Sequence, residues 1–148
     1  MRSADGVCTI LIGSEAAELE GDLATQFTDS KLVRNDRKLS DDLRKILRLI
    51  EMPSEGLELP LDIRGTPFQQ RVWDELLRIP PGSIVTYGAL ANRIGEPGAV
   101  RAVANACAAK AIALAIPCHR VVRINGTLSA YRWGVERKRA LLAKEALA

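Results

Sequence analysis

The stretch Ile116-Pro117-Cys118-His119-Arg120-Val121-Val122 places one of the three cysteines of the chain beside its only histidine. A thiol acts as a nucleophile only as the thiolate, and an imidazole nearby can accept its proton. Neighbouring side chains of an extended segment point to opposite faces, so we expect Cys118 and His119 to communicate through a water or a bend. The alternative, which adjacency alone favours, is a small buried cysteine beside a surface histidine.

Length and composition indicate one domain, or one domain with a small appendage. The chain has 148 residues and is 47% apolar, which suffices for a core. No apolar run approaches the roughly 20 residues of a membrane span, and no apolar signal region follows Met1. Three cysteines without paired spacing favour reduced thiols and a cytoplasmic location. With one histidine and no Cys-x-x-Cys pair, we expect neither a metal site nor a cofactor.

The charge is divided unevenly along the chain. Residues 87–148 carry ten Lys/Arg and three Asp/Glu, a net of +7, whereas residues 1–86 have a net of −4. A basic C-terminal part suits a polyanion such as DNA. Ordinary solvated helix faces produce the same asymmetry, so charge alone leaves both interpretations open.

The first 62 residues are predicted to form a small α+β unit. Apolar residues at spacings of three and four indicate its helices, and β-branched, apolar runs bounded by turn residues indicate its strands. The predicted elements are a strand over residues 7–12, a helix over residues 15–27, a helix that starts at Ser40 and ends at Pro53, and an edge segment over residues 57–61.

Residues 63–148 are predicted to form a mostly helical second domain. Its first helix is expected to begin at Thr66, where a threonine, a following proline and a glutamine three residues on make a capping box. Its last helix is expected over residues 135–146, with residues 137–139 in solvent. Glu145 lies near the end of that helix, where a carboxylate opposes the helix dipole. Either a partner or solvation of a frayed end would explain that position.

A helix-turn-helix is predicted in the middle of this domain. A short helix over residues 87–94, a glycine-containing turn and a helix over residues 99–109 have its outline. Arg101 and Asn105 share the outer face of the second helix, where almost every other position is alanine. Small residues let a helix lie close to a groove, but an ordinary packed helix fits the same pattern. The residues expected on the inner face are Val100, Val103, Ala104 and Cys107.

A hairpin is predicted after the reactive stretch. Val121-Val122 favours a strand, Asn125-Gly126 favours a tight turn, and residues 127–131 return. A hairpin that follows a helix-turn-helix makes a winged arrangement plausible. The predicted fold class is therefore α+β, with a small α/β unit ahead of a winged helix-turn-helix-like domain.

Several motifs of this chain together resemble the O6-alkylguanine-DNA alkyltransferases, also called methylated-DNA–protein-cysteine methyltransferases. Within that family, the resemblance is strongest to the C-terminal domain of the bacterial Ada adaptive-response proteins. It is dense over residues 59–145 and loose over residues 7–58, and it implies a ribonuclease H-like N-terminal unit, here without its first strand. The motifs are Pro117-Cys118-His119-Arg120-Val121-Val122, Tyr131-Arg132-Trp133-Gly134, Arg137-Lys138, Val72-Trp73, Thr86-Tyr87 and Ala99-Val100-Arg101-Ala102-Val103-Ala104.

The resemblance implies repair of DNA by direct reversal of damage. In such a reaction an alkyl group passes irreversibly from O6 of guanine, and from O4 of thymine, to Cys118. The base must first be flipped out of the stack. Each molecule acts once, as a suicide methyltransferase. The implied partner is double-stranded DNA that contains O6-alkylguanine, bound by a monomer in the bacterial cytoplasm.

The resemblance also assigns roles to individual residues. A relay of glutamate, histidine and water that activates the cysteine falls on Glu145 and His119. Tyr87 matches a tyrosine that assists protonation of the leaving guanine. Arg101 matches an arginine that fills the space left by the flipped base. The implied catalytic residues are Cys118, His119, Glu145 and Tyr87, and the implied DNA-binding residues are Arg101, Ala102, Asn105, Tyr131 and Arg123.

Three positions depart from the family pattern. Lys110 stands where asparagine is usual, Ala111 where proline is usual, and Ala130 where bacterial relatives usually have glycine. The change at Lys110 keeps open a non-catalytic module that binds alkylated bases. The helix-turn-helix itself keeps open a third function, that of a transcriptional regulator.

Overall fold

A capping box starts the helix on which the C-terminal half is assembled. The computed structural model describes residues 1–109, 112–128 and 131–148, and α3 spans Pro67–Leu77. Thr66 Oγ1 accepts a hydrogen bond from Gln69 N at 3.2 Å, and Gln69 Oε1 accepts one from Thr66 N at 2.9 Å. Two N–H groups at the start of the helix are thereby satisfied, which confirms the predicted helix start.

The predicted helix-turn-helix is present as α4 (Tyr87–Arg93) and α5 (Val100–Ala109). Thr86 Oγ1 caps α4 by accepting a hydrogen bond from Ala89 N at 3.1 Å. α5 packs on both α3 and α4, and Trp73 Nε1 of α3 donates to Ala106 O at 2.9 Å. The prediction for Val100 is wrong: it is 40% exposed, because it opens α5 ahead of the part that packs on α3.

The predicted strand at Val121-Val122 is confirmed, but its predicted partner is wrong. β2 (Val121–Val122) pairs in parallel with β1 (Val85–Thr86), and Val85 lies opposite Val121. The turn at Asn125-Gly126 is present, since Gly126 has a φ of 76° and its N–H donates to Arg123 O. Thr127 and Leu128 form no strand, so the described part of the expected wing is a turn.

The helices of the N-terminal half are α1 (Ala16–Gln26) and α2 (Asp36–Glu51), followed by the short η1 (Pro53–Glu55). The predicted start of α2 at Ser40 is wrong. Asn35 caps the helix instead, because its Oδ1 accepts a hydrogen bond from Lys38 N at 2.9 Å.

The strand predicted over residues 7–12 is also wrong, whereas the edge segment expected over residues 57–61 makes one bridge, from Leu61 to Val7. Val7 makes isolated bridges to Arg2 and Leu61, and Ile10 makes one to Ile112. Val7 and Ile10 pair with different neighbours, and Pro60 cannot donate to a ladder, so these bridges do not extend into a regular sheet. A ribonuclease H-like N-terminal unit is therefore not confirmed, and the fold is a helix-rich α+β arrangement with a two-stranded sheet in its described residues.

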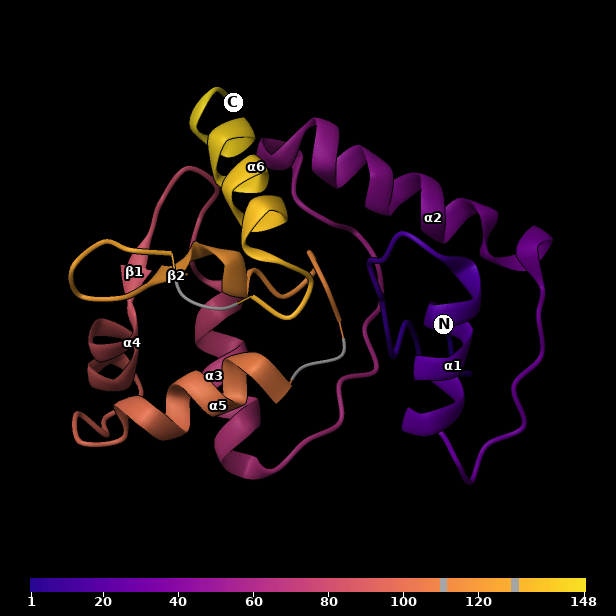
Figure 1. The fold of residues 1–148 in the computed structure, drawn as a ribbon, viewed down its shortest axis with the longest axis horizontal. Coiled ribbons are helices and arrows are strands. Elements are labelled where there is room, and N and C mark those ends of the chain that lie inside the picture. Colours follow the sequence, from indigo (N-terminus) through magenta and orange to yellow (C-terminus); the bar gives the residue numbers. More distant parts are fainter. Residues whose placement is uncertain (110–111, 129–130) are drawn as a thin grey trace.

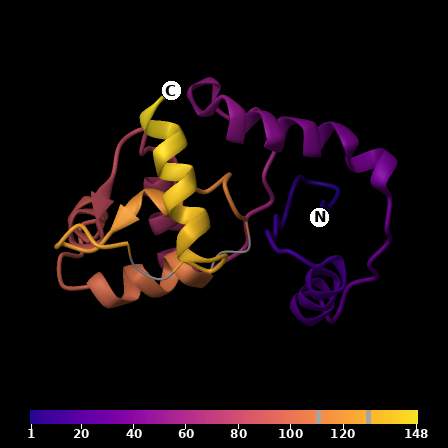
Figure 2. The same cartoon turned by 45° about the horizontal axis from the view of Figure 1, so that its top comes forward.

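The two halves of the chain meet where α2 approaches α6. Figures 1 and 2 show α2 running over the N-terminal part until its end lies beside α6 (Val135–Ala146). The bounds of α6 confirm the predicted last helix. One hydrophobic cluster includes Val7 and Ile46 from the N-terminal half and Leu76, Leu90 and Val103 from the C-terminal half. No described helix is both long and apolar enough to span a bilayer.

Candidate active site

The reactive stretch is folded into a tight turn. Cys118–Arg120 forms the 3₁₀ helix η2, in which Arg120 N donates to Pro117 O at 3.0 Å. The Cys118 side chain points away from that of His119 because each residue of such a turn rotates the direction by about 120°. His119 is only 2% exposed and Cys118 only 7%. The interpretation of His119 as a surface histidine is therefore wrong, and the bend that is present does not turn the two side chains toward each other.

His119 is paired with Glu145, which lies 26 residues further along the chain. Its Nε2 lies 2.7 Å from Glu145 Oε1, and both side chains are buried. Burial raises the pKa of Glu145, but hydrogen bonds and positive charge from His119 and Arg120 outweigh it and hold that pKa at about 2. Glu145 is therefore ionised at neutral pH, and its unfavourable place near the end of α6 is explained by these partners.

Arg120 holds the same carboxylate from a second side. Its Nε donates to Glu145 Oε2 at 2.9 Å and its Nη2 to Glu145 Oε1 at 2.8 Å. Its Nη1 donates to Ile79 O, two residues beyond the end of α3. Arg120 thus ties η2 to α3 and α6. No role was predicted for Arg120 from the sequence, although its place next to the lone histidine was the available signal.

The N-terminal half covers this buried pair from behind. Leu49 and Ile50 of α2 and Pro53 of η1 line a void of about 10 Å³ together with His119 and Glu145. A void of this size admits about one water. The described structure therefore excludes bulk solvent from the Glu145 side of the histidine.

Lys138 contradicts the expectation that residues 137–139 are solvated. It is 1% exposed, and its Nζ donates to Val121 O at 2.6 Å. Its neighbours Arg137 and Arg139 are exposed, as predicted. The error arises because the sequence shows which residues share a helix face, but not that β2 lies against the face that carries Lys138.

Tyr131 is buried in the same hydrophobic cluster as Cys118. Its ring meets that of Trp133 edge to face, with the centroids 5.3 Å apart. Its hydroxyl is buried and has no hydrogen-bond partner among the described residues. Burial, followed by negative charge at Cys118 and Glu145, raises the pKa of Tyr131 well above its usual range. The phenol therefore stays protonated and can donate a hydrogen bond.

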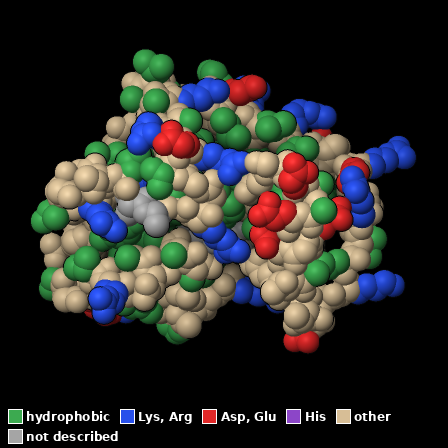
Figure 3. All heavy atoms as spheres, viewed as in Figure 1, with side chains coloured by type: hydrophobic (Ala, Val, Ile, Leu, Met, Phe, Trp, Pro, Cys, Tyr) green, Lys and Arg blue, Asp and Glu red, His purple; other side chains and the backbone are tan. Residues whose placement is uncertain are grey.

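The residues expected to bind DNA lie on exposed surfaces. Arg101, Ala102 and Asn105 are exposed on α5, and Arg123 is exposed after β2. Tyr87 opens α4 and is half-buried against the core. On the face drawn in Figure 3, acidic side chains gather mainly over the N-terminal half, in keeping with the charge asymmetry of the sequence.

The other two cysteines take no part in the described site. Lys110, Ala111 and Ala130 lie outside the described residues. Cys107 is buried on α5, as predicted, and Cys8 is half-buried, with its Sγ 3.7 Å from Met1 O. No cluster of potential metal ligands occurs among residues 1–109, 112–128 and 131–148.

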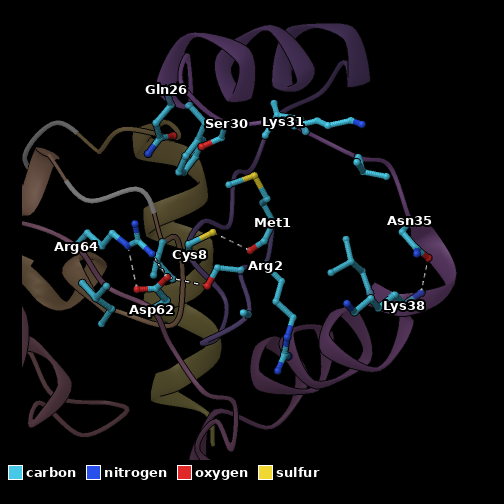
Figure 4. Close-up of a pocket in the computed structure, with 18 of the residues that line it drawn as sticks. Met1, Arg2, Cys8, Gln26, Ser30, Lys31, Asn35, Lys38, Asp62 and Arg64 are labelled. Carbon is cyan, nitrogen blue, oxygen red and sulfur yellow. Dashed lines mark hydrogen bonds and ion pairs between the residues drawn. The ribbon is translucent and has the colours of Figure 1, made fainter.

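A separate cavity of about 640 Å³ lies in the N-terminal half (Figure 4). Figure 4 shows Met1, Cys8, Lys31 and Asp62 around it, from the N-terminal segment, the α1–α2 connection and the approach to α3. Ile112 and Ile116 close its other side, whereas Cys118, His119 and Glu145 do not line it. The cavity is therefore distinct from the reactive stretch.

Comparison with known proteins gives a consistent match. The family model of the 6-O-methylguanine DNA methyltransferase DNA-binding domain matches residues 67–147. The Escherichia coli protein named bifunctional transcriptional activator/DNA repair enzyme Ada is 50% identical over 141 residues, which cover 95% of this chain and 40% of that protein. The chain likewise spans 40% of the regulatory protein Ada of Salmonella typhimurium. A Candida albicans methylated-DNA–protein-cysteine methyltransferase is 36% identical over 150 residues, with 95% of this chain and 85% of that protein covered.

Solved structures agree with this match. Mycobacterium tuberculosis OGT in complex with DNA superimposes with a TM-score of 0.67 at 43% identity, covering 72% of this chain and 67% of that one. The O6-methylguanine-DNA methyltransferase of Pyrococcus kodakaraensis gives a TM-score of 0.72 at 29% identity, covering 87% and 78%. With a family model that matches more than half of its residues, this chain belongs to the 6-O-methylguanine DNA methyltransferase family.

Proposed function

We propose that this chain repairs alkylated DNA by moving a methyl or other alkyl group from O6 of guanine, and from O4 of thymine, to Cys118. The observation that carries the proposal is the buried pair of His119 and Glu145, 2.7 Å apart and directly beside Cys118. A buried imidazole whose charge a carboxylate can offset is suited to accept a thiol proton. The names of the matched relatives support the same reaction class.

The proposed reaction needs no group beyond protein, water and DNA. A water between Cys118 and His119 carries the thiol proton to the imidazole, and Glu145 stabilises the imidazolium. The Cys118 thiolate attacks the alkyl carbon as its bond to O6 breaks, and the bonding electrons remain on the guanine. Tyr87 supplies the proton that the leaving guanine takes up. The thioether that forms on Cys118 is stable, so each molecule acts once.

Tyr131 is assigned to the wall of the base pocket. A flipped base must be held by stacking and by hydrogen bonds to its edge. The buried hydroxyl of Tyr131 has no partner among the described residues, and its raised pKa keeps it a donor. A flipped guanine would supply the missing acceptor.

The outer face of α5 is assigned to double-stranded DNA that contains O6-alkylguanine. Arg101 would enter the duplex and fill the space of the flipped base, with Ala102 and Asn105 beside it and Arg123 on a phosphate. Alanines around Arg101 allow close approach, and the basic C-terminal part attracts the polyanion. The protein would act as a monomer in the bacterial cytoplasm.

We further assign residues 1–62 to an N-terminal domain and residues 63–148 to the DNA-binding and transfer domain. The family match over residues 67–147 supports the boundary. In this arrangement a ribonuclease H-like N-terminal domain covers the back of the His119–Glu145 pair, in keeping with the side chains of α2 that line the void there.

The Cys118→Ser variant tests the proposal. It should bind duplex DNA with one O6-methylguanine as tightly as the wild type, but it should leave the lesion in place. The matched control is Cys107→Ser, which changes another buried cysteine and should keep transfer. Removal of the lesion by Cys118→Ser would refute the assignment, and binding without transfer by the wild type would indicate a non-catalytic binding module.

A further inference from the structure

The cavity in the N-terminal half is large enough to hold a small molecule. Its volume of about 640 Å³ lies within the range of about 300 to 1,000 Å³ that is usual for ligand sites. The N-terminal segment, the α1–α2 connection and residues 62–64 surround it (Figure 4). Trp73 of α3, together with Ile112 and Ile116, closes it from the C-terminal half. The cavity therefore lies between the two halves of the chain, and ligand sites are common at such junctions.

The floor of the cavity, formed by Trp73, Ile112 and Ile116, is apolar and fixed. Trp73 is only 3% exposed, and its Nε1 donates to Ala106 O at 2.9 Å, so the indole is held in place. The two isoleucines are buried as well. A molecule that covers this floor with an apolar surface removes apolar area from water on both sides, which favours binding.

The rim of the cavity is positively charged. Lys31 of the α1–α2 connection and Lys38 of α2 line it, and Figure 4 shows them on opposite sides of the cavity. Neither lysine forms an ion pair with a carboxylate of the described residues. Both side chains are exposed and keep their charge, so the rim attracts an anion.

The remaining charged side chains at the cavity are already paired. Arg64 donates to Asp62 and Arg2 donates to Asp42, at 2.9 Å in each case. Asp62 is the one acidic residue among the described residues that line the cavity. These pairs cancel each other's charge, so the two lysines decide the sign of the charge that a ligand meets.

The apolar floor and the cationic rim each exclude a different kind of ligand. An inorganic anion would leave the floor in contact with water, and an uncharged apolar molecule would make no charged contact with the lysines. We propose that the cavity binds a small amphipathic anion, whose apolar body covers Trp73 and Ile116 and whose carboxylate lies between Lys31 and Lys38. The site is separate from the reactive cysteine and its buried pair, so this inference goes beyond the proposed function and does not depend on it.

A ligand in the cavity would also touch the segment that leads into the reactive turn. Ile116 lines the cavity, and its carbonyl oxygen accepts a hydrogen bond from Cys118 N at 2.8 Å. Contact with the Ile116 side chain should therefore change the amide resonance of Cys118, although Cys118 itself does not line the cavity.

Titration of the full chain with octanoate tests the inference. Isothermal titration calorimetry should show one saturable site. Octanol has a similar apolar body without the charge, and it should bind about fivefold more weakly, the loss expected from two exposed ion pairs. Acetate has the charge without the apolar body, and it should not saturate over the same concentrations.

The two tryptophans of the chain locate the bound octanoate. Trp73 lines the cavity, whereas Trp133 does not. In ¹H–¹⁵N NMR spectra, octanoate should shift the indole N–H resonance of Trp73 and leave that of Trp133 unchanged. This measurement uses the wild-type protein, so it does not depend on the folding of a variant.

A double variant tests the cationic rim. Lys31→Gln combined with Lys38→Gln should raise the Kd for octanoate about fivefold and leave that for octanol unchanged. Arg37→Gln is the matched control, because it removes an exposed positive charge that neighbours Lys38 on α2 but does not line the cavity. Its Kd for octanoate should equal that of the wild type.

Three results would overturn the inference: no saturable binding of octanoate, a shift of Trp133 in place of Trp73, or equal Kd values for the double variant and for Arg37→Gln. None of these measurements involves alkyl transfer from DNA. The cavity can therefore fail as a ligand site while the proposed function stands, and the proposed function can fail while octanoate still binds.

Discussion

His119 Nε2 lies 2.7 Å from Glu145 Oε1, and this contact joins the only histidine of the chain to a carboxylate near its C-terminal end. Both groups are buried, and Arg120 holds the same carboxylate through two hydrogen bonds. The arrangement keeps the carboxylate charged and fixes the ring beside Cys118. A charged, buried partner of this kind stabilises an imidazolium as it forms.

Glu145→Gln should slow alkyl transfer while Cys118 is retained. Glutamine keeps the volume and can still bond His119, but it cannot offset a positive imidazole, so the proton acceptor is weakened. We expect the single-turnover rate constant to fall by about 10²-fold, the lower end of general-base contributions. Quench-flow with a duplex containing O6-methylguanine measures it. Glu136→Gln, an exposed change on the same helix, is the control, and a Glu145→Gln rate within twofold of the wild type would contradict the relay.

The stability of the protein should depend on the ionisation of Glu145 in acid. Its folded-state pKa of about 2 lies below the ordinary 4.5, so its contribution is complete above pH 4.5 and is lost as the pH falls toward 2. Glu145→Gln lacks this contribution at every pH. The difference in unfolding free energy between wild type and variant should therefore be largest near pH 6, and it should shrink by up to about 3 kcal/mol at low pH. Urea unfolding at pH 6 and pH 3 checks this, and a difference that grows in acid would refute it.

Arg120→Met should destabilise the fold strongly. The change leaves Glu145 buried with one fewer cationic partner and leaves Ile79 O without its hydrogen bond from Arg120. Breaking a buried pair from one side costs about 3 to 5 kcal/mol. Arg139→Met, which removes an exposed pair with Glu136, should cost about 1 kcal/mol or less. An equal decrease in the free energy of unfolding for the two variants would contradict the larger contribution expected of the buried pair.

Arg101→Ala should weaken DNA binding without loss of stability. Arg101 is exposed on α5, so its removal should change the unfolding free energy by less than about 0.5 kcal/mol. Loss of one cationic contact should reduce the slope of log K against log salt by about one. Fluorescence anisotropy at several salt concentrations measures this. Arg37→Ala, which removes an exposed charge from α2, should leave the slope unchanged, and an equal effect of both variants would contradict the assigned DNA face.

Local signals made the helices of the C-terminal half predictable. Thr66 and Thr86 cap α3 and α4 through residues three positions away, and such contacts are visible in the sequence. The strand at residues 7–12 was predicted wrongly because a strand depends on distant partners. Val7 forms bridges with Arg2 and Leu61, whereas Ile10 forms one with Ile112. The local sequence pattern around Val7 and Ile10 does not predict these partners.

The candidate site was predictable in its chemistry but not in its contacts. Cys118 and His119 stand out by composition, and Glu145 stands out by its unfavourable place in a helix. The burial of Lys138 and the two hydrogen bonds from Arg120 to the Glu145 carboxylate depend on how α6 packs against η2 and β2. These contacts join residues that are 17 and 25 positions apart, so spacing within one helix cannot reveal them.

The most direct test of the central claim is intact mass and peptide mapping after the protein reacts with duplex DNA that contains a single O6-methylguanine. The account predicts a gain of one methylene unit, located on Cys118, with one lesion removed for each protein molecule modified. A methyl group on Cys8 or Cys107, or lesions removed in excess of protein with no change in mass, would contradict it.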